Sequence, residues 1–159
     1  MAGSYFFGYS PIRAVRVSGH SMSPTLNWGD WVLFRKFQLP VSFATSAGAE
    51  SSKRRLDHQM EQLEKASEKL ENRLLQKIVL IARLGPDGQR DLMQIKRVVK
   101  VEFIESIPTE STETGRANAS EIGIWVEGDN ASQSSDSRHW GHISPDEIIG
   151  IYLTRYHHG

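Results

Sequence analysis

The sequence has 159 residues and a formal net charge of zero, because 19 lysines and arginines balance 19 aspartates and glutamates. This length fits one domain with a hydrophobic core. The balanced charge provides neither the basic excess typical of nucleic-acid binding nor the acidic excess of a solvating tail. The chain contains no cysteine, which excludes disulfides, thiol nucleophiles and thiolate metal sites.

The N-terminal segment is aromatic, with Tyr5, Phe6, Phe7 and Tyr9 close together. It predicts a first strand or a clasp on the core, with a shallow membrane-surface anchor as the alternative. No stretch approaches the roughly 18 consecutive apolar residues of a membrane helix, and no signal-peptide pattern is present. The location therefore stays open between a soluble, cytoplasmic protein and one with peripheral membrane contact.

Apolar runs separated by turn residues predict a series of short strands. In chain order the expected strands are 13–18, 31–37, 78–84, 92–99, 101–104, 122–127 and 148–156. Turn chemistry is present at 27–30 and 85–88, and 108–121 has the composition of a loop. The two runs within 92–104 are expected to continue a hairpin. Short strands joined by turns predict a mainly β, mostly antiparallel fold.

Residues 51–77 interrupt this pattern with a charged segment that contains neither Gly nor Pro, which predicts an inserted α-helix. Its heptad positions, spaced alternately by four and three, are Leu56, Met60, Leu63, Ser67, Leu70 and Leu74. Ser51 or Ser52 can supply the N-cap, and the small residues at 42–49 predict a hinge. The helix either lays its apolar stripe on the parent domain or forms a coiled coil with a partner protein, and both alternatives stay open.

Ser21 is the first residue with candidate chemistry, and a serine needs a base to become a nucleophile. His20 is adjacent, but neighbours on an extended chain point to opposite faces. His139 and His142 stay open as bases. A lysine can serve if burial among apolar groups lowers its pKa. Lys96 has an apolar sequence context, but spacing alone does not assign it to catalysis, because most strand lysines face solvent.

Four sequence boxes resemble, in the same order, those of the family of bacterial signal peptidase I and mitochondrial inner-membrane peptidase. They are Ser21-Met22-Ser23-Pro24-Thr25-Leu26, then Gly29-Asp30-Trp31-Val32, then Lys96-Arg97-Val98, and finally Gly128-Asp129-Asn130 followed by Ser134-Ser135-Asp136-Ser137-Arg138. Four boxes in order are far more specific than one.

The resemblance implies a serine endopeptidase that removes signal or leader peptides from precursor proteins. It implies that Ser21 is the nucleophile and Lys96 its general base. It also implies that Ser134 hydrogen-bonds the lysine, while Asp136 and Arg138 brace the site.

The resemblance further implies one catalytic β domain over 1–159, with a signal-peptidase/LexA-like antiparallel β fold interrupted by the hinge and helix at 42–77. Met22 and Pro24 are expected to border a groove that binds the substrate as an added strand, with small side chains at the first and third positions before the cut. No metal, cofactor or nucleic acid is expected. The expected partners are the precursor substrate and a protein bound by 51–77.

Three features depart from the family, in addition to the inserted helix at 51–77, which is not typical of its minimal members. Only residues 1–17 precede the segment 18–26 that contains the first box, too few for the usual membrane helix. Gly19 stands where a hydroxyl often completes the oxyanion hole. Lys100-Val101-Glu102 replaces a Gly-Asp pair beyond the lysine box. A compact family branch that matures nickel-type superoxide dismutase is compatible with these departures. The alternatives are an inactive peptide-binding or scaffold module and a self-processing regulator cleaved at 42–49.

Overall fold

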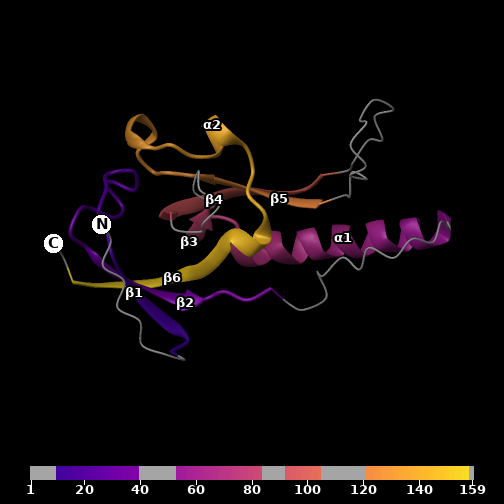
Figure 1. Cartoon of the computed structure of the whole chain (residues 1–159), viewed down its shortest axis with the longest axis horizontal. Helices are drawn as coiled ribbons and strands as arrows, with labels where there is room; N and C mark the ends of the chain where they lie inside the picture. Colours follow the sequence, from indigo (N-terminus) through magenta and orange to yellow (C-terminus); the bar gives the residue numbers. More distant parts are fainter. Residues whose placement is uncertain (1–9, 40–52, 84–91, 105–120, 158–159) are drawn as a thin grey trace.

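The computed structural model describes residues 10–39, 53–83, 92–104 and 121–157, and Figure 1 shows their arrangement. Six strands form one sheet in the order β1-β2-β6-β3-β4-β5, and all pairings are antiparallel. The strands are β1 (Ile12–Arg16), β2 (Trp31–Lys36), β3 (Ile78–Arg83), β4 (Leu92–Ile104), β5 (Glu121–Glu127) and β6 (Ile148–His157). The prediction of a mainly β, antiparallel fold with one main helix is confirmed.

The central strand β3 is buried on both faces of the sheet. Val79 and Ile81 belong to one core cluster, whereas Ile78 and Leu80 belong to a second cluster on the other face. Successive side chains of a strand point to opposite faces, so a strand covered on both sides is apolar throughout. This explains the continuous apolar run in the sequence, and it leaves the sheet with a core on each side.

The helix α1 (Lys53–Leu74) covers the first cluster with its C-terminal half. Leu70 and Leu74 are buried there, and Leu63 packs against the same cluster from a partly buried position. In Figure 1 the N-terminal end of α1 extends past the ends of the strands. The C-terminal half of the stripe therefore lies on the parent domain, and a coiled-coil contact of the N-terminal half stays a prediction. Within the described residues, no helix combines the length and the apolar composition needed to cross a membrane.

The two runs expected at 92–99 and 101–104 form one strand, β4. Through Leu92–Arg97 it pairs with β3, and through Arg97–Ile104 it pairs with β5. A register shift between Val98 and Lys100 marks the point where the sequence pattern breaks. A bulge inserts an extra residue and bends a strand without ending it, which is why the pattern indicated two segments.

Several predicted features fall outside the described residues. These are the aromatic N-terminus, the hinge at 42–49, the N-cap serines, the turn at 85–88 and all but the last residue of the loop at 108–121.

Candidate active site

Ser21 lies in the connection between β1 and β2, and its neighbours fasten this loop to the core. Met22 and Leu26 are each 1% exposed and belong to the second core cluster. The amide of Leu26 donates to the carbonyl of Met22 at 2.9 Å, and the amide of Asn130 donates to the carbonyl of Ser21 at 2.9 Å. The candidate nucleophile is therefore held from beneath by the core and from the side by the segment after β5.

Gly128 allows these two segments to approach closely. A Cβ atom at Gly128 would lie 2.3 Å from the Oγ of Ser134 and 2.5 Å from the carbonyl oxygen of Ser21. Both distances are shorter than real Cβ contacts, so only glycine fits between the two serines. The fourth sequence box thus supplies the spacing that brings Ser134 beside the Ser21 loop.

Lys96 is on β4, opposite Val79 of β3, and its side chain is only 3% exposed. Its Nζ donates a hydrogen bond of 2.8 Å to the Oγ of Ser134. Burial lowers the pKa of Lys96 because the charged ammonium loses its hydration. The carboxylate of Asp136 opposes this shift and the charge of Arg138 adds to it, and the net pKa lies below 10.5. Burial thus favours the neutral amine, which is the form that can accept a proton.

Asp136 is fully buried and lies behind Ser134. The Gly128 amide donates to its Oδ2 at 2.9 Å, and the Arg138 guanidinium donates to both carboxylate oxygens, at 2.8 and 2.6 Å. Burial alone would raise the pKa of Asp136, but hydrogen bonds from Arg138, Gly128 and Ser134 outweigh it and hold the pKa well below its usual range. The fixed negative charge of Asp136 therefore orients the Ser134 hydroxyl that accepts from Lys96.

Two ion pairs that sequence reasoning missed attach the site to the sheet. Asp30, expected to be a turn residue, is 2% exposed, and its Oδ2 accepts from Arg155 of β6 and from the amide of Asn27, each at 2.9 Å. Arg97 binds Asp129 through two hydrogen bonds of 2.8 and 2.7 Å. The partners are 125 and 32 residues apart in the sequence, so no local pattern indicates either pair.

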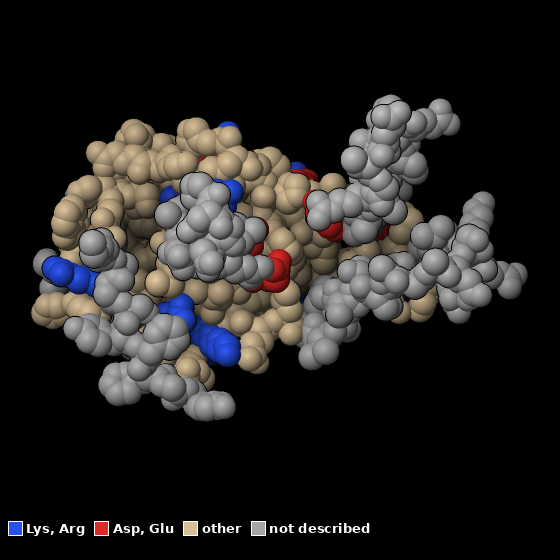
Figure 2. Space-filling view, viewed as in Figure 1, with Lys and Arg blue, Asp and Glu red and all other residues tan. Residues whose placement is uncertain are grey.

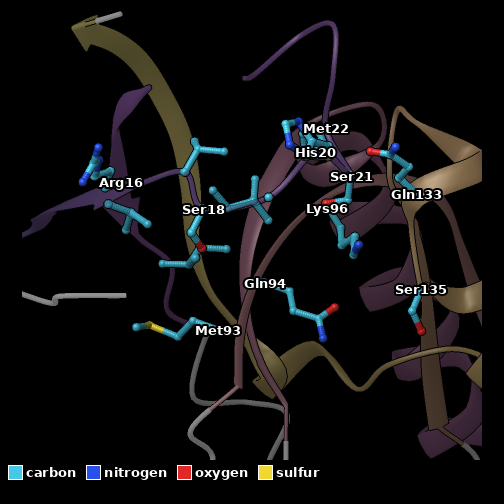
Figure 3. Close-up of a pocket in the computed structure, with 15 residues that line it drawn as sticks. Arg16, Ser18, His20, Ser21, Met22, Met93, Gln94, Lys96, Gln133 and Ser135 are labelled. Atoms are coloured by element: carbon cyan, nitrogen blue, oxygen red, sulfur yellow. The ribbon is translucent and has the colours of Figure 1, made fainter. Parts of the chain in front are cut away.

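A pocket of about 330 Å³ lies between the segment that contains Ser21, strand β4 and the segment after β5. The residues that line it are 15–22, Leu80, 93–96, Gln133 and Ser135. Figure 3 shows Ser21 and Lys96 at one end of the pocket, close to His20 and Met22, with Arg16 and Met93 farther along. Of the two residues expected to border a groove, Met22 lines this pocket, whereas Pro24 is exposed and is not among the lining residues.

The two histidines left open as bases do not line the pocket. His139 is on α2 (Ser137–Trp140), where its Nδ1 accepts from the Asp136 amide at 3.4 Å. His142 lies 3.0 Å from the carboxylate of Glu121. Of the side chains considered as bases, only His20 and Lys96 line the pocket together with Ser21. His20 is the immediate chain neighbour of Ser21, so Lys96 is the candidate base that comes from a separate segment.

Charged side chains, which include possible metal ligands, also lie outside this pocket among the described residues. On the face seen in Figure 2, acidic and basic side chains are scattered in small groups among the described residues. In the part of the chain that the structure describes, no three His, Asp or Glu side chains are arranged to hold a metal. No protein-family model matches the chain, and no curated protein matches it either.

Proposed function

We propose that this protein is a serine endopeptidase that removes signal or leader peptides from precursor proteins, with Ser21 as the nucleophile and Lys96 as the general base. The observation that carries the proposal is the environment of Lys96, which is buried in the same pocket as Ser21 and hydrogen-bonded to the Ser134 hydroxyl at 2.8 Å. A lysine in such an environment has a lowered pKa and can act as a base.

The proposed chemistry uses the side chains that share this pocket. Neutral Lys96 removes the hydroxyl proton of Ser21 as its oxygen attacks the substrate carbonyl. The resulting oxyanion is held by the backbone N–H of Ser21, and one such donor contributes about 3 to 4 kcal/mol. Lys96 then gives its proton to the departing amine, which leaves an ester on Ser21. Water, deprotonated by the same lysine, hydrolyses this ester and regenerates the hydroxyl.

The two free strand edges beside the pocket support an extended peptide as the substrate. Within the described residues, β5 pairs with β4 only from Arg97 onward, so no strand covers that edge of 92–96. β1 is the terminal strand of the sheet, and its outer edge has no strand partner in the described chain. Both segments line the pocket. A peptide bound as an added strand would satisfy the backbone groups at such edges.

The buried lysine distinguishes this proposal from the alternative of an inactive peptide-binding or scaffold module. A binding module needs free strand edges but has no use for a lysine whose ammonium form is destabilised by burial. The resemblance to precursor-processing peptidases suggests a leader peptide as the substrate. A single metalloenzyme precursor, such as that of nickel superoxide dismutase, is a narrower version of the same activity.

The test is the cleavage of a synthetic leader peptide with Ala-x-Ala before the scissile bond. The reactions are run at pH values from 6 to 10, and the products are measured by mass spectrometry. We expect cleavage by the wild type and none by Ser21→Ala or Lys96→Met. Lys100→Met is the matched control, because Lys100 is on the same strand but exposed, and it should retain activity. Cleavage that survives Lys96→Met would refute the Ser/Lys mechanism, and a wild type that cuts no leader peptide would favour the binding module.

A further inference from the structure

The side chains of β4 divide the pocket into two different walls. Met93 and Ile95 pack toward the second core cluster, whereas Gln94 and Lys96, which alternate with them, belong to the opposite face of the strand. Figure 3 shows Gln94 on the same side of the pocket as Lys96 and Ser135, and Met93 on the other side. The wall on the Met93 side combines apolar side chains with Arg16 and Ser18, and the other carries an amide, an amine and a hydroxyl.

Gln94 is unusual on this polar wall because its amide oxygen is unsatisfied. The Oε1 atom is buried and has no hydrogen-bond partner, a situation shared in the described residues only by the Nε of Arg83. Arg83 has other contacts, with its guanidinium 3.7 Å from the Trp140 ring centroid and 3.9 Å from a Glu147 oxygen. Buried acceptors are nearly always paired, so an unpaired one that borders a pocket indicates an absent donor.

We propose that Gln94 selects substrates with a hydroxyl or carboxamide side chain at an even-numbered position before the cut. This inference rests on the proposed peptidase function. A peptide added to the free edge of 92–96 would continue the sheet, so its side chain beside Gln94 would share the face of Gln94. The flanking peptide side chains would point to the face of Met93 and Ile95, where small apolar residues fit.

The chemistry of the amide favours a group that both donates and accepts. A rotation of half a turn about the terminal bond of Gln94 exchanges its oxygen and its NH2 group, so either can face the pocket. A serine, threonine or asparagine side chain can donate to the unsatisfied oxygen. A leucine or valine leaves this oxygen unpaired, and a carboxylate has no proton to donate.

The test measures binding and cleavage separately. Peptides based on Ala-x-Ala carry Thr or Val, and Asn or Leu, at the second or the fourth position before the cut. Binding is measured by calorimetry on Ser21→Ala and on the double variant Ser21→Ala with Gln94→Leu. Cleavage is measured as kcat/KM for the wild type and for Gln94→Leu. At one of the two positions we expect the polar peptide to be favoured by about three- to tenfold in both assays, and Gln94→Leu to abolish this preference.

The outcomes separate this inference from the proposed function. Cleavage with equal preference for Thr and Val, or a polar preference that survives Gln94→Leu, would overturn the role of Gln94 and leave the peptidase intact. Polar-selective binding without cleavage would support Gln94 and overturn the peptidase. Gln94→Leu should not lower the melting temperature, because it removes an unpaired acceptor. A large loss of stability would instead assign Gln94 a structural role and overturn the inference.

Discussion

Replacement of Gly128 by alanine tests whether the close approach of the two serine-bearing segments is needed for activity. The added methyl group would lie 2.3 Å from the Oγ of Ser134 and 2.5 Å from the carbonyl oxygen of Ser21, whereas ordinary contact begins at 3.4 Å. One or both segments must therefore move by about 1 Å. A misplacement of this size lowers the rate by about 100-fold, and overpacking of this kind destabilises a fold by about 1 to 3 kcal/mol.

The assay is kcat/KM with the leader peptide, together with urea unfolding of the same preparations. Gly19→Ala is the matched control, because it also changes a glycine near Ser21 but its Cβ would have no atom within 4 Å. We expect Gly19→Ala to retain most of its activity. If folded Gly128→Ala cleaves as fast as the wild type, the spacing between Ser21 and Ser134 does not govern catalysis.

Three further predictions concern charge. The proposed base Lys96 can accept a proton only when it is neutral, so kcat/KM should rise with pH through a midpoint below 10.5. Arg138→Gln should move this midpoint upward, because it removes a nearby positive charge that lowers the pKa of Lys96. An unmoved midpoint would contradict the assigned base. Since the pKa of Lys96 is lower in the folded state, the unfolded chain binds more protons between that pKa and 10.5, and wild-type stability should rise with pH in this window. Lys96→Met should be inactive, should melt no lower than the wild type at pH 7, and should lack this rise of stability with pH. A lower melting temperature of this variant would be evidence against burial as the cause of the lowered pKa of Lys96. Arg155→Met leaves buried Asp30 without its guanidinium partner and should reduce the free energy of unfolding by about 1 to 3 kcal/mol in urea titrations, whereas exposed Arg35→Met should change it little.

The sequence predicted the elements of the fold better than their arrangement. Each described strand was anticipated within a few residues, because alternation and turn chemistry are local properties. The position of β6 between β2 and β3 could not be predicted from the sequence, because it depends on pairings between distant residues, such as Trp31 with His157 and Val79 with Ile151. The bulge in β4 was interpreted as a break for the same reason, since its register is set by β5.

For the site, sequence boxes placed Ser21, Lys96 and Ser134 in three separate segments, and the structure brings these segments together. Residues that act through long-range contacts carried no local signal. Arg155 was read only as part of a final strand, and Gln94 only as part of the expected strand at 92–99. The burial of Lys96 itself contradicts the usual behaviour of a strand lysine, and it depends on tertiary packing that the spacing of residues does not contain.

The insertion of β6 into the middle of the sheet has a consequence for biosynthesis. Among the described strands β6 is synthesised last, yet it joins the β1–β2 pair to the β3–β4–β5 unit. Until it is made, the hairpin that presents Ser21 has no strand pairing with the unit that carries Lys96 and Ser134. Loop closure over such separations is slow compared with the formation of local hairpins. A nascent chain therefore carries Ser21, Lys96 and Ser134 well before the strand that joins their segments is available, so the proposed peptidase would be assembled only when β6 pairs with both β2 and β3.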